Sequence, residues 1–562
     1  MLRITGYSDK YSVCPGDRLK FYVNSEKKES YDVDIVRLIH GDTNPDGPGF
    51  KEKVIKAPCN KSYKGKSQKI HGGSYVCVQP DHRMDTSSFT LQAFIFPTTP
   101  DKGVQGLITK WIEPQQSGFG MFIDENGCLA CWVGNGKGRA AKISSRKPLM
   151  RKVWYLAAVS YDAKTRRVKI IQEPVVTPTN GGLGLSMLHP SSHTTGSVSQ
   201  VVKVKPELNT SPLLIAAATK RINSGRSVKG GHYKEALEEF PLPEQDCVYN
   251  GKIDRPRFSN KALDKHEIYT LARGFDTSPA DLRASVVAAW DFHANISDNI
   301  ASCQIIDVSH NKLNGFIINL PVRGMTGYNW TSDDIVYHHV PHEYGAIHFH
   351  DDDIDDARWE ESFSYEIPKN LKSGIYGARL RIGGKESPET EDYVPFFVRP
   401  PLGKATAKVC FIVPTNSYLA YSNDNLATNS VVAELLAGRV PIMQASDLYL
   451  NEHREYGLST YSCHSDGSGV CYSTRLRPIL NMRPKYLHVL SPSIWQFNAD
   501  LHLVDWLHEL DYDVDIYTDE DVQREGVDLL NRYPIVLTGH HPEYISEAVS
   551  YTHLTLPTIL LV

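Results

Sequence analysis

A polar turn near the end of the chain carries residue types that could bind a metal or move a proton. It reads Gly-His-His-Pro-Glu over residues 539–543 and directly follows an apolar run over residues 533–537. Such a run, bounded by turn residues, predicts a buried strand, and open α/β sheets bind ligands at the carboxyl ends of their strands. We therefore expect His541 and Glu543 at the mouth of a site, with Pro542 in the first turn of a helix. A capping carboxylate beside a partly exposed imidazole is the alternative interpretation.

The elements that would position this turn alternate between strand and helix from residue 405 onwards. Strands are predicted at 407–413, 487–490, 513–517 and 534–537, and a helix at 499–510. This alternation predicts a mostly parallel sheet with helices on both faces. The first strand ends in PTNSYLAYSN, at the same expected sheet edge as His541 and Glu543, and EYGLSTYSCHSDG lies in the long loop that follows.

The chain before residue 405 is predicted to be β structure in two parts. Residues 1–66 and 313–400 each contain too few strands for a stable sandwich, so we expect them to pair as one discontinuous immunoglobulin-like domain. Residues 67–312 contain many evenly spaced strands, which predicts a two-sheet sandwich. Its segments FTLQAFIFP, VWYLAAVSYD and GKIDRPRFSNKAL resemble the laminin-G or concanavalin-like jelly roll. Modules with this fold bind sugars, proteins or nothing at all.

Composition excludes several classes of function. The chain has 562 residues, a net charge of −4 and no basic run, so nothing favours binding to nucleic acid or to an anionic membrane. No stretch reaches the roughly 20 apolar residues of a membrane span, and the amino terminus does not resemble a secretory signal. The 10 cysteines form no dense framework, which fits reduced thiols. We therefore expect a cytoplasmic protein of several domains.

Two further groups of potential metal ligands have structural interpretations. His348 and His350 alternate with apolar residues, which indicates one half-buried strand instead of the helical spacing of zinc ligands. Cys128 and Cys131 form a Cys-x-x-Cys inside an apolar strand pattern with no second pair. We interpret these two cysteines as buried small side chains.

Six phrases, taken in order, carry a resemblance to a known family. They are GDTNPDGPGFKE, GAIHFHDDDIDDARWE, SGIYGARLRI, YVPFFVRP, PTNSYLAYSN and VLTGHHPEY. Together they resemble the large subunit of N,N-dimethylformamidase and its relatives, from the first residues to about residue 547. The resemblance implies that residues 405–548 form an α/β domain similar to a class I glutamine amidotransferase, with a flavodoxin-like sheet, but without the cysteine nucleophile. It also implies a small partner subunit and homo-oligomerisation of the large subunit.

The same resemblance implies a mononuclear Fe(III) centre. By motif, Tyr421 and Tyr461 would be the phenolate ligands and Glu543 the carboxylate, with Tyr418 and Tyr456 as alternative tyrosines. Hard anionic oxygen donors suit ferric iron, and a metal with open positions can polarise an amide carbonyl. His541 could then carry a proton to the departing amine. The implied reaction is hydrolysis of a small N-substituted formamide, such as N,N-dimethylformamide, to an amine and formate.

Residues 549–562 resemble translated sequencing-adapter sequence, so we expect the native chain to continue beyond Ala548 and this fragment to be inactive. Two other functions are kept as alternatives. One is a carbohydrate-binding or structural protein built on the jelly roll. The other is a different amidase or a glutaminase-like hydrolase, which would need a nucleophilic cysteine in a strand-to-helix turn, and no cysteine occupies such a turn in the predicted elements.

Overall fold

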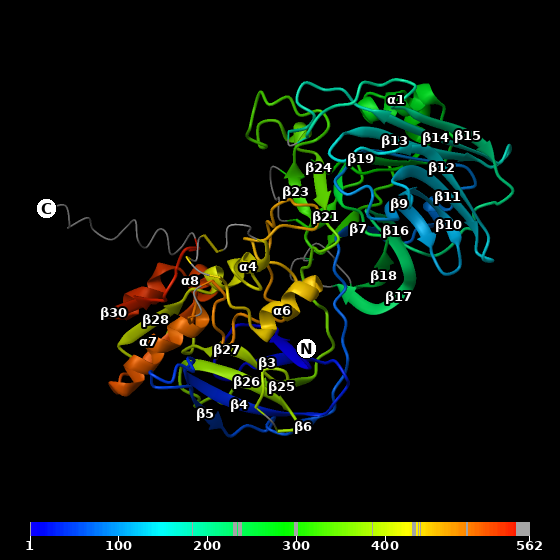
Figure 1. Cartoon of the computed structure of the whole chain (residues 1–562). Coiled ribbons are helices and arrows are strands. Elements are labelled where there is room, and N and C mark those ends of the chain that lie inside the picture. The colour runs from blue at the N-terminus through cyan, green and yellow to red at the C-terminus, as the bar shows by residue number, and fades with distance from the viewer. Residues whose placement is uncertain are drawn as a thin grey trace. The chain divides into compact units, whose positions relative to one another are not determined.

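The computed structural model of the chain describes residues 2–182, 184–228, 233, 239–296, 302–384, 386–429, 434–435, 438, 440–490 and 493–546. The chain divides into two compact units (Figure 1). One consists of Met1–Ile70 with Asp355–Val562, and the other of His71–Ile354. Among the residues described, no helix combines the length and the hydropathy that crossing a bilayer requires.

The first unit begins as a sandwich of two sheets. Each sheet contains strands from before and from after residues 71–354, which form the other unit. One sheet has the order β1(Ile4–Ser8), β3(Arg18–Ser25), β25(Phe363–Glu366). The other has the order β2(Ser12–Val13), β27(Glu391–Val398), β26(Gly374–Ile382), β4(Tyr31–His40), β5(Lys51–Ile55), with β6(Ser62–Tyr63) beside β4. Strands β4 and β26 are antiparallel, with Ile35 opposite Ala378. The expected pairing between the amino-terminal strands and the later strands is therefore present for residues 363–398.

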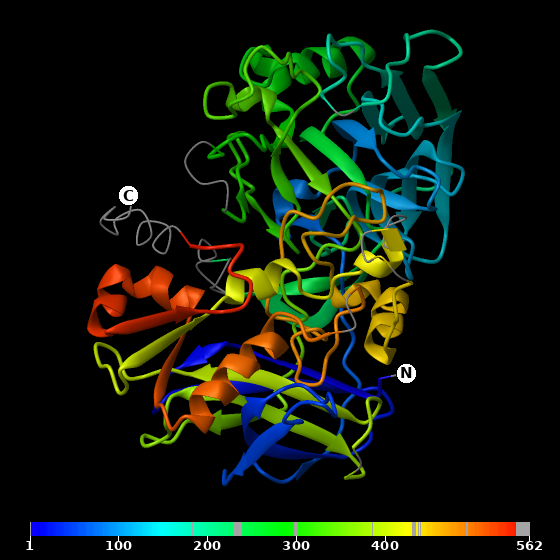
Figure 2. The same cartoon turned by 60° about the vertical axis from the view of Figure 1, so that its left-hand side comes forward.

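A parallel sheet follows in the same unit. Its order is β29(Val514–Thr518), β28(Val409–Val413), β30(Ile535–Thr538), and both pairings are parallel. The helices are α3(Thr415–Ala420), α4(Leu426–Asn429), α6(Ala445–Glu452), η3(Arg454–Tyr456), α7(Phe497–Glu509), α8(Asp519–Glu525) and η4(Val527–Arg532). Helix α7 lies along β4, as Figure 2 shows, and Phe497 and Leu501 pack with Val36 and Leu38 in one apolar cluster. The sandwich and the parallel sheet thus share a core.

Three local predictions in this part differ from the structure. Residues 487–490 form no strand, and His488 makes only an isolated bridge to Ser493. The run is short and is followed in sequence by Pro492, which cannot donate to a sheet. Strand β30 is not buried, because it is an edge strand, and Ile535 is 50% exposed. Residues 541–546 are not helical, so the turn containing Glu543 is irregular where the helix was predicted; residues 547–548 lie outside the described part.

The second unit is a sandwich of two large sheets. The first has the order β12(Ala140–Pro148), β11(Cys128–Asn135), β10(Ser117–Ile123), β9(Gln105–Ile112), β16(Leu213–Ile215), β7(Tyr75–Val78), β22(Gly315–Ile318), β21(Gln304–Ile305), with β17(Ala218–Val228) and β18(Phe240–Asp246) attached. The second has the order β15(Gly196–Val201), β14(Arg167–Pro174), β13(Tyr155–Asp162), β8(Phe89–Pro97), β19(Gly251–Ser259), β24(Ala346–Phe349), β23(Val322–Met325), with β20(Val286–Ala289) beside β19. The helices are η1(His82–Met84), α1(Lys265–Arg273), α2(Ala280–Ala284) and η2(Pro341–Glu343). One large apolar cluster lies within this unit.

The boundary of this unit differs from the sequence interpretation. We placed residues 313–354 in the immunoglobulin-like domain, but β22 pairs with β7, and β24 pairs with β19. These strands therefore belong to the inserted sandwich, which extends to Ile354. The prediction failed because short antiparallel strands carry no pattern that shows which sheet they join. Strand β24 is also buried along its whole length, since it lies between β19 and β23 and is not a half-buried strand.

Candidate functional site

Two tyrosine side chains from separate segments of the first unit meet at the carboxylate of Glu543, which lies in a third segment. The hydroxyl of Tyr421 donates to Glu543 Oε2 at 2.6 Å, and the hydroxyl of Tyr461 donates to Glu543 Oε1 at 2.7 Å. The two tyrosine rings stack, with centroids 4.1 Å apart and planes inclined by 16°. The structure therefore brings together the three residues that the sequence motifs singled out as metal ligands.

Two of the three segments follow strands of the parallel sheet at its carboxyl edge, and the third is attached to one of them. Tyr421 is the C-cap residue of α3, the short helix that follows β28. Glu543 lies in the irregular turn after β30. Tyr461 belongs to a loop that is attached to the end of α3, because the N–H and the hydroxyl of Thr460 both donate to Ala420 O, at 2.9 and 3.0 Å. The arrangement follows the rule that parallel sheets place ligand sites beyond the ends of their strands.

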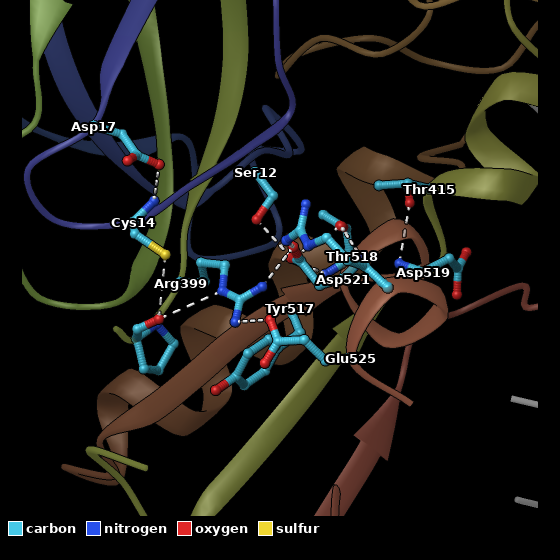
Figure 3. A network of polar contacts seen from close by, with 12 residues as sticks. Ser12, Cys14, Asp17, Arg399, Thr415, Tyr517, Thr518, Asp519, Asp521 and Glu525 are labelled. Atoms are coloured by element: carbon cyan, nitrogen blue, oxygen red, sulfur yellow. Dashed lines mark hydrogen bonds and ion pairs between the residues drawn. The ribbon is translucent and has the colours of Figure 1, made fainter. Parts of the chain in front are cut away.

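A buried polar network fixes the start of α3 (Figure 3). The N–H of Asp519 donates to Thr415 Oγ1 at 3.2 Å. The N–H of Asn416 donates to Asp519 Oδ2 at 2.9 Å, so α3 and α8 are joined by two hydrogen bonds. The network continues from α8 to the sandwich, since Arg399, directly after β27, donates to Asp521 Oδ1 at 2.8 Å. Asp521 also accepts from Ser12 Oγ at 2.6 Å. Helix α3 is thus held by groups that lie outside the site.

The loop that carries Tyr461 is organised by a buried guanidinium. Arg477 is 1% exposed and donates to Tyr456 O at 2.8 Å and to Leu458 O at 2.9 Å. It also donates to Ser422 Oγ at 2.6 Å, in the residue that follows Tyr421. Burial lowers the pKa of this guanidinium to about 10, which still leaves it charged at neutral pH. One arginine therefore links the two segments that present the tyrosines.

The turn that carries Glu543 is held by two residues that sequence reasoning did not select. Ser417 Oγ, on α3, accepts hydrogen bonds from the N–H groups of Glu543 at 3.0 Å and Tyr544 at 3.1 Å. Asp500, on α7, accepts from the N–H of His540, and also from the hydroxyl of Tyr418. Neither contact produces a local sequence pattern, because Ser417 is 126 residues from Glu543 and Asp500 is 40 residues from His540.

The two alternative tyrosines have hydroxyls engaged elsewhere. Tyr418 is 3% exposed and bonds to Asp500. Tyr456 is also 3% exposed, and its hydroxyl lies 3.0 Å from Thr5 Oγ1 and 3.2 Å from the hydroxyl of Tyr449. In contrast to Tyr421 and Tyr461, these tyrosines support the packing around the site and are not directed at Glu543.

His541 lies beside the three converging residues. Its Nε2 is 2.9 Å from Glu543 Oε2, and its side chain is 36% exposed. The ring of Trp495 packs against His541 at 4.9 Å and against Tyr421 at 5.8 Å between centroids. The hydroxyl of Tyr544 lies 2.8 Å from that of Tyr461. His541 is therefore oriented by its contact with Trp495, and its partly exposed side chain is accessible to a substrate.

The electrostatics describe hydrogen-bonded phenols around an ionised carboxylate. Hydrogen bonds from Tyr421 and Tyr461 lower the pKa of Glu543 below its usual value. Burial and the hydrogen bond to Glu543 raise the pKa of Tyr421 to about 12, and burial with the neighbouring hydroxyls raises the pKa of Tyr461. Without a cation, both phenols keep their protons, and each proton lies in a hydrogen bond between a phenol oxygen and the carboxylate.

This donor set fits a hard, highly charged cation. Two phenol oxygens and a carboxylate lie within hydrogen-bond distance of one another, and a bound cation would lower the pKa of each phenol and replace the bridging protons. Anionic oxygen donors are those that hard ions prefer, whereas zinc and copper more often take imidazole or thiolate. The residues present are thus suited to ferric iron.

Comparison with known proteins identifies the family. Residues 322–554 match the family described as N,N-dimethylformamidase beta subunit-like, C-terminal, and residues 71–171 match the concanavalin A-like lectin/glucanases superfamily. The N,N-dimethylformamidase beta subunit of Paracoccus aminophilus is 39% identical over 551 residues, which are 97% of this chain and 68% of that protein. The corresponding subunit of an Alcaligenes species is 37% identical over 548 residues, again 97% of this chain and 68% of that protein.

The chain belongs to the N,N-dimethylformamidase beta subunit family. Solved structures with similarity include a pentraxin from Limulus polyphemus, at 13% identity and a TM-score of 0.21, covering 42% of this chain and 82% of that one. The IT-sialidase CBM40 of Ruminococcus gnavus is 11% identical, with a TM-score of 0.24, covering 36% of this chain and 95% of that one. Within the dimethylformamidase family match, residues 322–554 include the turn that carries Glu543 and both converging tyrosines.

Proposed function

We propose that the native protein hydrolyses the C–N bond of a small N-substituted formamide, with N,N-dimethylformamide as the type substrate, to an amine and formate. The proposal includes a mononuclear Fe(III) held by Tyr421, Tyr461 and Glu543. The observation that carries it is the convergence of two tyrosine hydroxyls on one carboxylate, in a chain 39% identical to a protein named as a dimethylformamidase subunit. When bound, ferric iron would supply a Lewis acid that polarises the amide carbonyl.

The chain's own residues would perform the remaining tasks. Tyr421, Tyr461 and Glu543 provide an anionic set of oxygen donors, and their backbone supports keep them in place before substrate arrives. A dialkylformamide offers a carbonyl oxygen and an uncharged nitrogen, so positioning must come from the carbonyl and from apolar contact with its methyl groups. The ring of Trp495, which packs against His541, and the 40% exposed ring of Tyr544, which packs against Tyr461, border the converging side chains and would provide such contact.

His541 would manage the proton that leaves with the amine. Its Nε2 shares Glu543 Oε2 with the hydroxyl of Tyr421, at 2.9 and 2.6 Å, so the imidazole can hold a proton at a defined atom next to the reaction site. An amide nitrogen is a poor leaving group until it is protonated, and an imidazole is the usual donor near neutral pH. His541 is therefore assigned as the general acid that protonates the departing amine.

The finer assignments of the sequence interpretation are carried into this proposal. We infer an immunoglobulin-like sandwich formed by the paired strands around the insertion, and an α/β part similar to a class I glutamine amidotransferase. A small partner subunit, homo-oligomerisation of this subunit and a cytoplasmic location complete the proposal. The names of the relatives as beta subunits support an assembly with a second type of subunit.

The deciding experiment combines metal analysis with visible spectroscopy. Phenolate bound to ferric iron gives a charge-transfer band, so we expect a coloured protein with one iron per chain. Tyr421→Phe and Tyr461→Phe should each lower iron content and the band together, and Glu543→Gln should abolish formamide hydrolysis. Tyr512→Phe is the matched control, since Tyr512 is 57% exposed and outside the site.

His541→Ala separates proton transfer from metal binding. It should keep the iron and the visible band but lose at least about 100-fold in kcat, the scale of general acid catalysis. A colourless wild-type protein, or full iron content in both tyrosine variants, would contradict the iron assignment. Binding of glycans by the jelly-roll unit, with no amide hydrolysis by the protein, would instead favour the carbohydrate-binding alternative.

A further inference from the structure

A second group of potential metal-ligand side chains lies in the first unit and shares no residue with the group formed by Tyr421, Tyr461 and Glu543. His40 ends strand β4, Asp42 follows it in a loop, and His502 lies on α7. One potential ligand atom from each residue lies within 4.8 Å of the other two. The three residues come from the sandwich and from the α/β part, which share a core in this unit.

The central residue of this group is buried with its ring nitrogens unsatisfied. His40 is 3% exposed, and neither Nδ1 nor Nε2 makes a hydrogen bond. Asp505 Oδ2 lies 3.0 Å from His40 Nδ1, which is within ion-pair distance but outside hydrogen-bond geometry. A buried polar group without a hydrogen bond is destabilising, so this position calls for a ligand.

The other contacts leave one carboxylate oxygen of Asp42 facing His502. Asp42 Oδ1 accepts from the N–H of Asn44 at 3.0 Å, which leaves its second oxygen, Oδ2, 3.8 Å from His502 Nε2. That gap is too wide for a hydrogen bond. It is close to the separation of about 3.4 Å between neighbouring ligands of a tetrahedral zinc ion with bonds near 2.1 Å.

The backbone around the group is held tightly. A Cβ at Gly41 would lie 1.6 Å from Asn498 Oδ1, so the loop between His40 and Asp42 is in direct contact with the first turn of α7. The N–H of Lys485 also donates to Gly41 O at 2.8 Å. His40, Asp42 and His502 are therefore held near one another by the packing of the loop against the helix.

We propose that His40, Asp42 and His502 bind a divalent transition-metal ion of the Zn²⁺ type. Imidazole nitrogen and carboxylate oxygen are common ligands of such ions. Asp505, which faces His40 Nδ1 and is in turn paired with Lys51 Nζ at 3.0 Å, takes the part of the carboxylate that orients a metal-binding histidine. The rings of His40 and His502 stack with centroids 4.6 Å apart, so their nitrogen lone pairs lie in nearly parallel planes, and the 46% exposed side chain of His502 would have to rotate about its χ angles to bind the same ion.

The role of this ion is structural. It joins the end of β4 to α7, and α7 also carries Asp500, which supports the turn of the formamide site through the N–H of His540. The site contains no tyrosine and lies in different segments from the proposed iron ligands, so it stands whether or not iron is bound at Glu543.

The test measures Zn²⁺ binding by the full chain after treatment with a chelator. To remove the other centre, the protein carries Tyr421→Phe and Tyr461→Phe. Calorimetric titration with Zn²⁺ should give one equivalent per chain, and His502→Ala or Asp42→Asn should weaken binding at least about 10-fold. His508→Ala, also exposed and on the same helix, should bind as the parent does. Zn²⁺ should raise the Tm of the parent by more than that of His502→Ala at the same concentration.

A second measurement does not depend on the tyrosine variants. Crystals of the wild-type protein soaked in Zn²⁺ should show an anomalous peak at the zinc edge between His40, Asp42 and His502. The proposal is overturned if no peak lies there, or if the parent binds no Zn²⁺. It is also overturned if His502→Ala and Asp42→Asn bind Zn²⁺ with undiminished affinity.

Discussion

Ser417 accepts the N–H of Glu543 at 3.0 Å, across 126 residues of sequence. This bond joins the first helix after β28 to the turn after β30, so the hydroxyl sets the position of the carboxylate relative to both tyrosines. Because the same oxygen also accepts from the N–H of Tyr544, it supports two successive amides of an irregular segment. The geometry of the site thus depends on a residue that touches neither a substrate nor a proposed metal.

Replacing Ser417 with Ala should loosen Glu543 without removing any donor of the site. Two amides would lose their acceptor, at a cost of about 1–3 kcal/mol. We expect iron to dissociate about 10-fold more readily and kcat/KM to fall by a similar factor, measured by iron retention after dialysis and by formamide turnover. Ser417→Thr keeps the hydroxyl and should restore both values. Unchanged iron retention in Ser417→Ala would show that the turn is held by other contacts.

Gly539 is required by close packing, so Gly539→Ala should displace the turn. A Cβ at this position would lie 2.4 Å from Pro414 Cδ and 2.6 Å from Asp500 Oδ2. We expect at least a 10-fold loss of activity together with a lower Tm, measured by turnover and by thermal unfolding. Gly469→Ala is the control, because a Cβ at Gly469 meets nothing within 4 Å. Equal activity of the two variants would refute the packing argument.

Arg477→Lys tests the buried guanidinium that links the tyrosine segments. Lysine keeps the charge but cannot reproduce the fork that reaches Tyr456 O, Leu458 O and Ser422 Oγ. We expect a loss of about 3 kcal/mol in the free energy of unfolding, from several charged hydrogen bonds, measured by urea denaturation. The visible band should weaken as Tyr461 becomes less constrained. Arg532→Lys, at an exposed position, should leave stability and spectrum intact.

A pH-dependent stability is expected from Asp254 in the jelly-roll unit. Burial raises the pKa of this carboxyl to about 6 from its usual 3.8. The folded state therefore holds the proton more tightly than the unfolded chain, so the stabilising contribution is complete below about pH 3.8 and is lost as pH rises through about 6. At 1.36 kcal/mol per pKa unit, the loss amounts to at most about 3 kcal/mol.

Asp254→Asn should remove this dependence. Above pH 7 the variant should be more stable than the wild type, and the difference should shrink as the pH falls toward 4. Scanning calorimetry of the full chain at several pH values measures it, through the transition whose midpoint the substitution shifts. Parallel profiles for the two proteins would show that Asp254 does not titrate in this range.

Sequence reasoning identified the converging residues through motifs but not the groups that support them. The apolar runs at β28, β29 and β30 and the helical period of α7 were sufficient to place these elements. Tyr421, Tyr461 and Glu543 came from the family resemblance, since two tyrosines in loops carry no local signal of their own. Ser417 and Asp500 were missed because their partners lie far along the chain, and a serine and an aspartate near helix starts are ordinarily read as caps.

The errors in the fold have a common cause. Residues 487–490 and the helix after Glu543 were predicted from local composition, but each lies where tertiary contacts decide the conformation. The boundary near residue 313 failed for the same reason, since β22 and β24 join sheets whose other strands lie much earlier in the sequence. Local pattern indicates that a segment is extended, whereas its partner strand is set by the packing of the whole unit.

The first and last residues of the jelly-roll unit lie next to each other. Within that unit, the N–H of Gly73 donates to Asp353 O at 2.8 Å and the N–H of Ser74 donates to His350 O at 2.9 Å. In the first unit, the N–H of Glu360 donates to Gln68 Oε1 at 2.6 Å, so the segments that precede and follow the insert also lie close together. A few residues would suffice to rejoin Ile70 to Asp355, and the ends of His71–Ile354 are already adjacent. The insert is thus a cassette that evolution could acquire or exchange in one recombination event, and that an engineer could transplant into another host loop.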